Sequence, residues 1–266
     1  MTDTACPAAL PGFADHLADV AGGILREQAG LPPQVEIKPD GTPVTQVDRM
    51  VEQAVRAEIM RAYPGHGILG EEFPAHQPEA EHLWIIDPLD GTKEFVQGLP
   101  LFGFLLALAW RGEIVLGLAE QPLLRHRWLG ANGHGTVFNG RKVAVRPCKA
   151  LADAVVSTQG YDTFCPAHHD RLLALRQAGR STVAADSFYV FGLVANGRVD
   201  LVASDGFALH DYAALDAVVR NAGGVVTDWQ GRRLTLESDR SIVAAGDAAL
   251  LPAVLPLLDR GPRKSA

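Results

Sequence analysis

The sequence predicts a layered mixed α/β fold with an antiparallel-rich first half and an α/β second half. Residues 102–130 hold apolar, β-rich stretches interrupted by turn residues, which is the pattern of a strand meander. From about residue 149 onward, short apolar strands alternate with segments of helical spacing. We therefore expect two halves, residues 1–148 and residues 149–266.

The elements of the first half follow from hydrophobic spacing and turn signals. Thr45 with Asp48 three residues later forms a capping-box pattern that opens a helix. Asn139-Gly140 marks a hairpin turn. The expected order is a helix within 13–29, a turn-rich loop at 38–48, a helix over about 46–62, short strands at 68–72 and 82–87, the meander, and a hairpin within 133–147.

The second half alternates helices and strands. Its last predicted helix stops at Gly223-Gly224, because glycine readily takes the left-handed conformation that ends a helix. The expected elements are helices at 167–178, 188–197 and 211–221 and strands at 199–204 and 225–229.

Composition narrows the class of protein. The chain has 266 residues, is 47% hydrophobic and carries a formal net charge of -7, which suits an enzyme with a large core. The acidic balance argues against a nucleic-acid partner, because no basic face is available to neutralise phosphates. The longest apolar run, residues 101–110, is too short to span a bilayer, so we expect no membrane partner.

Cysteines and the N-terminus indicate the compartment. Cys6, Cys148 and Cys165 are scattered and show neither metal-ligand spacing nor a disulfide framework. The first residues lack a basic segment followed by an apolar one, so they do not form a signal peptide. We therefore expect a cytoplasmic protein. Histidines in predicted loops, such as His66 and His82, have no ligand spacing and are expected to face solvent.

Two aspartates follow a buried strand in the stretch "LWIIDPLDGT", residues 83–92. Asp87 and Asp90 repel each other where water is scarce, so they need a cation. We expect a tight turn at Pro88 to point both carboxylates to one side, with the carbonyl of Leu89 between them. Such hard oxygen ligands favour Mg²⁺ or Mn²⁺. The alternative interpretation of this segment is an ordinary surface turn without a metal.

The residues after Asp90 are candidates to bind an anion and to orient a water molecule. Gly91 permits close approach of a ligand to the backbone, and the N–H groups of Gly91 and Thr92 are candidates to hold a phosphate. The Thr92 hydroxyl is a candidate to orient or deprotonate a water.

Two further acidic segments are ambiguous on their own. Glu71 and Glu72 follow another short strand, and the simpler interpretation is a solvated pair of acids. Asp211 lies where a helix should begin, so helix capping alone would explain it.

Taken together, these segments resemble the inositol monophosphatase superfamily of Mg²⁺-dependent, lithium-sensitive phosphatases. The resemblance extends over nearly the whole chain and is carried by "KPDGTPVTQVD", "GILGEE", "WIIDPLDGT", "HDYAAL" and "AGGVVTDWQG". It implies the αβαβα sandwich of fructose bisphosphatase and inositol monophosphatase. It also implies a small phosphate ester as substrate, two or three Mg²⁺ ions with Mn²⁺ as a substitute, and a homodimer.

The resemblance assigns roles by matched position. Glu71 corresponds to a metal ligand that also positions the attacking water, and Thr92 to the hydroxyl that acts with it. The other implied metal ligands are Asp87, which bridges two ions, the Leu89 carbonyl, Asp90 and Asp211. Asp48 corresponds to an acid near the site that is tied to an additional metal, although its capping role is an equal alternative.

Within the superfamily, the chain is most similar to the histidinol-phosphate phosphatase branch. The matching phrases include "GLAEQPLLRHRWLG" and "GGVVTDWQG". This similarity implies hydrolysis of L-histidinol phosphate to L-histidinol in histidine biosynthesis. Such a substrate carries an ammonium and an imidazole, so an acid should lie near them, and Asp186 matches the branch's aspartate. Helix capping is a compatible role for Asp186.

Departures from the branch keep other substrates open. Ser204 replaces a glutamate seven residues before Asp211, and the adjacent Asp205 is a candidate substitute. His210 stands where tyrosine or tryptophan is common. "DPLDGTKEF" resembles the bisphosphate nucleotidases, in which Lys93 would meet a second phosphate. Alternative functions are therefore a bisphosphate nucleotidase and an inositol or polyol monophosphatase.

Two hypotheses of another class complete the set. A non-catalytic relative that binds a phosphorylated metabolite should lack one of the expected metal and water residues, and none is missing. A structural Ca²⁺ site would favour more ligands and a looser loop.

Overall fold

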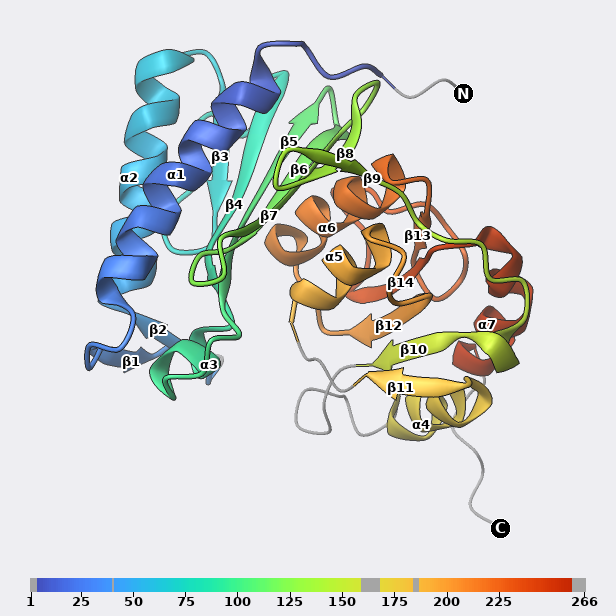
Figure 1. The fold of residues 1–266 in the computed structure, drawn as a ribbon. Helices are drawn as coiled ribbons and strands as arrows, with labels where there is room; N and C mark the ends of the chain where they lie inside the picture. Colours follow the sequence, from blue (N-terminus) through green and yellow to red (C-terminus); the bar gives the residue numbers. More distant parts are fainter. Residues whose placement is uncertain (1–3, 40, 159–167, 184–186, 260–266) are drawn as a thin grey trace.

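The computed structural model describes residues 4–39, 41–158, 168–183 and 187–259. They form five layers, helices and sheets in alternation, as Figure 1 shows. This arrangement confirms the predicted αβαβα sandwich. The helical layers are the outer pair α1 (Leu10–Gln28) and α2 (Gln46–Ala62), the central pair α5 (Tyr189–Ala195) and α6 (Leu209–Asn221), and the second outer pair α4 (His169–Ala178) and α7 (Leu251–Leu258).

The first sheet has seven strands in chain order, β3-β4-β5-β6-β7-β8-β9. β3 and β4 are parallel, and the other neighbours are antiparallel, so the predicted meander and hairpin are confirmed. The strands are β3 (Gly67–Gly70), β4 (His82–Asp90), β5 (Gly103–Trp110), β6 (Glu113–Gln121), β7 (His126–Ala131), β8 (Gly135–Phe138) and β9 (Arg141–Val143).

The second sheet has five strands in the order β11-β10-β12-β14-β13. Its strands are β10 (Val155–Thr158), β11 (Ser181–Val183), β12 (Leu201–Asp205), β13 (Val225–Thr227) and β14 (Ser241–Ala245). The smaller elements are the ribbon β1 (Val35–Ile37) with β2 (Pro43–Thr45), the short helix α3 (Thr92–Val96), and the 3₁₀ turns η1 (Leu151–Asp153) and η3 (Ala248–Leu250). Three-residue strands such as β1 carry too little pattern to be predicted from spacing.

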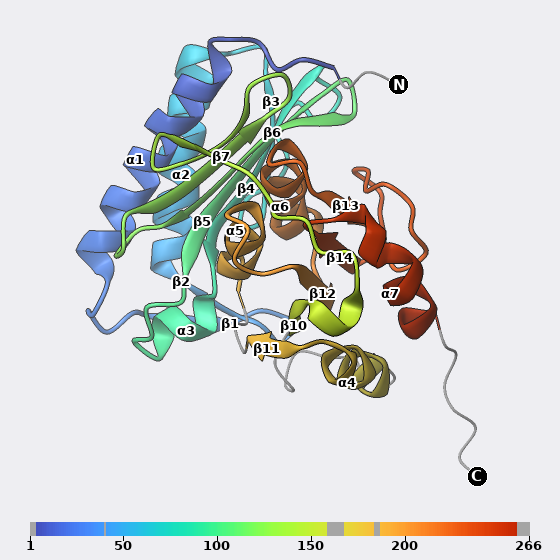
Figure 2. The ribbon, with the colours of Figure 1, turned by 45° about the vertical axis from the view of Figure 1, so that its right-hand side comes forward.

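The two sheets share the central helices α5 and α6, which lie between them in the turned view of Figure 2. One hydrophobic cluster includes Trp128 from the first sheet, Leu215 from α6 and Val202 from the second sheet. The predicted boundary between residues 148 and 149 lies between β9 and β10. The halves on either side of that boundary therefore share one core.

Among the helices that the structure describes, none combines the length and apolar character that a membrane span needs. Cys6 and Cys148 are buried free thiols, whereas Cys165 lies outside the described residues.

Two glycines let α6 pack directly on the first sheet. A Cβ added at Gly117 would lie 2.1 Å from the carbonyl oxygen of Ala214, and one at Gly130 would lie 2.5 Å from that of Ala217. The helix backbone therefore rests on the strands with no side chain between them. This contact fixes the position of α6, whose first turn carries Asp211.

We expect Gly117→Ala to lower the free energy of unfolding by about 1–3 kcal/mol, because the new methyl group overlaps helix backbone that cannot yield. Chemical denaturation measures this change. Gly23→Ala is the control: nothing lies within 4 Å of its added Cβ, and this helical position should gain up to about 1 kcal/mol. Equal stability of the two variants would contradict the packing argument.

His66 and His82 form part of a ring stack at the start of β4. Their ring centroids lie 4.5 Å apart in stacked geometry, and Tyr63 stacks on the other face of His66 at 4.6 Å. Trp84 Nε1 donates a hydrogen bond to His66 Nδ1 at 3.0 Å. The expectation that both histidines simply face solvent is therefore wrong. Burial, with a smaller contribution from His82, lowers the pKa of His66 to about 4.

This lowered pKa predicts a pH dependence of stability. The unfolded chain binds a proton at His66 near pH 6.5, whereas the folded chain resists it until about pH 4. The contribution of His66 is thus complete above pH 6.5 and is lost as the pH falls toward 4. Allowing for partial exposure, the free energy of unfolding should fall by about 1 kcal/mol between pH 7 and pH 5 through this group. Urea denaturation of His66→Gln should show a smaller fall, and an unchanged fall would exclude His66 as the source.

Candidate active site and metal centre

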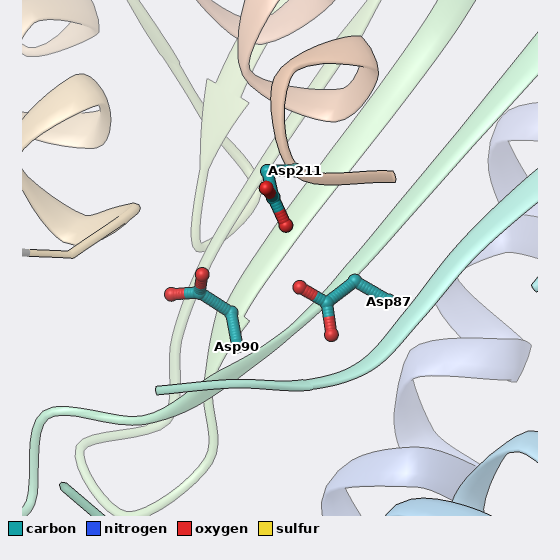
Figure 3. A group of neighbouring side chains, drawn as sticks. All are labelled: Asp87, Asp90 and Asp211. Atoms are coloured by element: carbon teal, nitrogen blue, oxygen red, sulfur yellow. The ribbon is translucent and has the colours of Figure 1, made fainter. Parts of the chain in front are cut away.

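Three aspartates from two parts of the fold meet at one point. Asp87 and Asp90 lie at the end of β4, and Asp211 lies in the first turn of α6. One carboxylate oxygen of each lies within 4.8 Å of those of the other two. Figure 3 shows the Asp211 side chain pointing from the helix toward the pair on the strand.

A bulge in β4, rather than a tight turn, directs Asp87 and Asp90 to the same side. The strand continues through Pro88, so the predicted turn at this residue is wrong. Asp87 pairs with Leu105 and Asp90 with Gly103, which means that three steps on β4 match two steps on β5. The extra residue is a bulge, a position that tolerates proline because no ladder hydrogen bond is needed.

The burial pattern along β4 shows the effect of this bulge. In a regular strand, residues three apart face opposite sides of the sheet. Ile86 and Leu89 are three apart, yet both belong to the hydrophobic cluster beneath α1 and α2. Ile85 lies on the opposite face of the sheet and packs against the central helices, and Asp87, two residues later, faces the same side. Asp90 also faces that side, beside Asp211. The bulge thus places both acids in the same cavity.

Backbone groups around the bulge and α6 orient the carboxylates. The Leu89 N–H donates to Asp87 Oδ1 at 3.0 Å, and the Ala208 N–H donates to Asp211 Oδ2 at 2.6 Å. The helix begins at Leu209 with Ala208 as its N-cap, so Asp211 is not the N-cap itself, but as the third helical residue it accepts from the N-cap backbone. Its capping role is compatible with its place in the cluster, because Asp211 Oδ1 is a separate acceptor.

The electrostatics of the three aspartates favour a bound cation. Burial, followed by repulsion from neighbouring carboxylates, raises the pKa of Asp87 and Asp90 well above the usual value. Burial also raises the pKa of Asp211, and His210 opposes that shift. Among the described residues, no lysine or arginine forms an ion pair with any of the three, and His210 Nε2 lies 3.4 Å from Asp211 Oδ1. A cluster of hard oxygen donors without a permanent cation fits Mg²⁺.

Glu71 and Glu72 follow β3, and Glu71 lines the same cavity from another side. Lys38 Nζ lies 2.7 Å from Glu71 Oε1 and 2.6 Å from Glu72 Oε1. Burial lowers the pKa of Lys38, but its hydrogen bonds to both glutamates outweigh burial and raise it. His210 Nε2 lies 3.7 Å from Glu71 Oε2. Glu71 is exposed and Glu72 is half-buried, so Glu71 is solvated as the simpler interpretation expected, but both acids also pair with Lys38.

Asp48 serves the helix cap and also contacts the site. Its Oδ2 accepts hydrogen bonds from the N–H and the hydroxyl of Thr45, at 2.8 and 2.6 Å, which confirms the capping box. Asp48 Oδ1 lies 3.1 Å from the Thr92 hydroxyl, which also lies 3.0 Å from the Leu89 carbonyl oxygen. The direct partners of the Thr92 hydroxyl are thus Asp48 and the Leu89 carbonyl, and any pairing of Thr92 with Glu71 must run through a water.

A cavity of about 710 Å³ is lined by Glu71, the three aspartates, Leu89 and Thr92. Gly91 has φ +82°, a conformation that glycine adopts readily, and it places Thr92 at the start of α3. Asp205 lines the cavity, whereas Asp186 lies outside the described residues. Other residues of the wall are Lys38, Lys93, Glu94, Ser187, Phe207, Leu236, Ser238 and Arg240.

Sequence reasoning missed several of these residues. Lys38 stands in the loop before α2, and a lone lysine there has no spacing that indicates a role. His210 departs from the usual tyrosine or tryptophan, and its place next to Asp211 is the one signal in the sequence that points to a role in the site. Arg240 donates to the Gly206 carbonyl at 2.6 and 3.0 Å from a loop distant in sequence, and no local pattern predicts that contact.

The chain matches the model of the inositol monophosphatase family over residues 10–260. It is similar to the chloroplastic bifunctional phosphatase IMPL2 of Arabidopsis thaliana, with 35% identity over 91% of this chain and 73% of that protein. It is also similar to a histidinol-phosphatase of Mycobacterium tuberculosis, with 38% identity over 81% of this chain and 85% of that protein.

A solved inositol monophosphatase from Zymomonas mobilis has the same fold. It superposes with a TM-score of 0.87 and 36% identity, covering 96% of this chain and all of that chain (100%). This chain combines the layered fold with an acidic cavity between its two halves, and this combination is typical of metal-dependent phosphatases. The chain belongs to the inositol monophosphatase family of phosphatases.

We expect Asp87→Asn to abolish phosphate release while preserving or raising the melting temperature of the metal-free protein. The substitution removes one of three mutually repelling charges but also removes a metal-ligand oxygen. Phosphate release with Mg²⁺ and thermal melting with chelator measure the two effects. Asp153→Asn on the exposed turn η1 is the control and should change neither. Substantial activity in Asp87→Asn would contradict the metal assignment.

Proposed function

We propose that this chain is a Mg²⁺-dependent phosphomonoesterase that hydrolyses a small phosphate ester with water as the nucleophile. The observation that carries this proposal is the convergence of Asp87, Asp90 and Asp211 with Glu71 around one cavity. The residues that would hold two or three Mg²⁺ ions, or Mn²⁺ in their place, are these four acids and the Leu89 carbonyl. Bound ions would supply positive charge that neutralises the phosphate and lowers the pKa of a water.

The chain's own groups position the reactants. Glu71 orients the attacking water and accepts its proton. The Thr92 hydroxyl donates its proton to Asp48 or to the Leu89 carbonyl, so its lone pairs remain to accept a hydrogen bond from the same water. The N–H groups of Gly91 and Thr92 hold a phosphate oxygen. The water oxygen bonds to phosphorus, the ester P–O bond breaks, and the leaving oxygen takes up a proton from solvent, while Glu71 later returns the proton it accepted to solvent.

L-Histidinol phosphate is the substrate that we favour, with L-histidinol as the product in histidine biosynthesis. Support comes from the similarity to the histidinol-phosphatase and from an acid in the cavity wall. Ser204 is fully buried and its hydroxyl turns toward the backbone carbonyl of Asp205, at 3.4 Å. Asp205 is therefore the better placed group to meet an ammonium or imidazole, and Asp186 is a second candidate.

Asp205 has one oxygen left for such a contact. Its Oδ2 forms an ion pair with His168 Nδ1, and Trp229 packs edge-on against the His168 ring. Asp205 Oδ1 is buried and has no hydrogen-bond partner among the described residues. Because an unpaired buried acceptor is costly, a donor from the substrate would relieve it once side chains around Asp205 shift to admit that donor.

An inositol or polyol phosphate is the second candidate, because the solved relative from Zymomonas mobilis is named an inositol monophosphatase. A nucleoside bisphosphate is a third, since Lys93 is exposed at the cavity wall and could contact a second phosphate. A non-catalytic role is disfavoured because Glu71, Thr92 and the aspartates all face the cavity. The cytoplasmic location and the homodimer belong to the same proposal.

We expect the specificity constant for L-histidinol phosphate to exceed those for inositol phosphate and a nucleoside bisphosphate. Asp205→Asn should raise KM for histidinol phosphate by about tenfold to a hundredfold, because a hydrogen bond to a charged group contributes about 1.5–3 kcal/mol. Its kcat should change little, and inositol phosphate serves as the control substrate. Steady-state assays measure these constants. A preference for either alternative ester would exclude histidinol phosphate.

The metal requirement is tested in the same assay. Chelation should abolish turnover, Mg²⁺ should restore it, and Ca²⁺ should not replace Mg²⁺ because its larger, more flexible coordination suits the reaction poorly. Turnover that persists after complete chelation would contradict the proposed mechanism.

A further inference from the structure

A buried acid outside the cavity lies directly behind the Glu71-Glu72 turn. Glu52 on α2 is fully buried, and Arg56, one helical turn later, is 9% exposed. Arg56 Nε donates to Glu52 Oε1 at 2.7 Å. Burial of a carboxylate is costly unless its oxygens are fully hydrogen-bonded, so the remaining partners of Glu52 indicate why it is there.

Those partners are backbone groups of the turn that carries Glu71. Glu52 Oε2 accepts from the Glu72 N–H at 2.7 Å, and Oε1 accepts from the Phe73 N–H at 3.3 Å. Arg56 Nη2 donates to the Phe73 carbonyl at 3.1 Å. The ion pair therefore holds both the N–H and C=O groups of the segment that follows Glu71.

The end of β3 is shaped to receive the Glu52 carboxylate. A Cβ added at Gly70 would lie 2.0 Å from Glu52 Oε1 and 2.7 Å from Oε2. Only a residue without a side chain leaves room for the carboxylate against this backbone. Gly70 is thus part of the same arrangement, one residue before Glu71.

The turn needs such support because its charges repel one another. Glu71 adds to the repulsion at Asp87, and Glu71 and Glu72 share the single ammonium of Lys38. Without a fixed backbone, the Glu71 carboxylate would move away from the aspartates toward solvent.

We propose that Glu52, held by Arg56, is a positioning residue that fixes the turn after β3 so that Glu71 faces the metal ions and the attacking water. This inference rests on the proposed function, because it assumes that Glu71 is a metal ligand. Glu52 itself touches neither substrate nor metal. It acts through the backbone of Glu72 and Phe73.

Glu52→Gln tests the proposal, because glutamine keeps the size of the side chain but replaces one acceptor oxygen with a donor. Amide hydrogen exchange at Glu72 and Phe73 should accelerate while β4 stays protected. Titration calorimetry with Mg²⁺ should show binding that is about tenfold weaker or more, as for other residues that orient metal ligands. Glu58→Gln is the matched control on the same helix and should leave both measurements unchanged, since among the described residues Glu58 pairs only with His16 and Arg61.

Gly70→Ala keeps the test decisive if Glu52→Gln fails to fold. The new methyl group should displace the Glu52 carboxylate and weaken Mg²⁺ binding. Amide exchange at Glu72 and Phe73 should accelerate in the same variant. Folded Gly70→Ala with wild-type Mg²⁺ affinity and unchanged exchange at these amides would overturn the inference.

Glu71→Gln separates failure of this inference from failure of the proposed function. If Glu71→Gln keeps wild-type activity and Mg²⁺ affinity, the role proposed for Glu71 is wrong. If Glu71→Gln is impaired while folded Glu52→Gln retains wild-type Mg²⁺ affinity, only the positioning role is overturned. A lowered melting temperature of Glu52→Gln with unchanged Mg²⁺ affinity has the same meaning, because it shows a purely structural role.

Discussion

Mutual repulsion among Asp87, Asp90 and Asp211 is the constraint on which the rest of the molecule depends. The three carboxylates meet where burial raises their pKa values, so the apoprotein carries an electrostatic cost at this point. The surrounding strands and helix hold the three carboxylates together against this repulsion. The bulge fixes two of them on β4, and direct backbone packing of α6 at Gly117 fixes the element that carries the third.

The same reasoning extends to the acids around this cluster. Four carboxylates in or beside the cavity have a hydrogen-bond donor: Leu89 N–H for Asp87, Ala208 N–H for Asp211, Thr45 for Asp48 and Lys38 for Glu71. These donors hold the acids while leaving further oxygens for a ligand. The site is therefore preorganised by ordinary strand and helix-end contacts, which lowers the cost of ordering it upon binding.

Local sequence signals predicted the fold class, α2 with its capping box, the meander, and the acids at the ends of β3 and β4. They failed where the structure depends on contacts between distant segments. Spacing alone suggested a turn at Pro88, because the register of β4 against β5 cannot be known before the strands pair. Glu52 reads as an ordinary helix residue until β3 is placed beside α2. His66 likewise joins a ring stack only when Tyr63 and His82 are brought together.

The bulge in β4 determines which side of the sheet the second acid faces. If the strand paired regularly with β5 at its present length, Asp87 and Asp90, three residues apart, would face opposite sides, and the Asp90 carboxylate would turn toward the apolar layer that Ile86 and Leu89 occupy beneath α1 and α2. A charge there would lack both water and a partner. Substitutions that straighten the strand would therefore damage the enzyme more severely than those that exchange side chains and leave the irregular pairing intact.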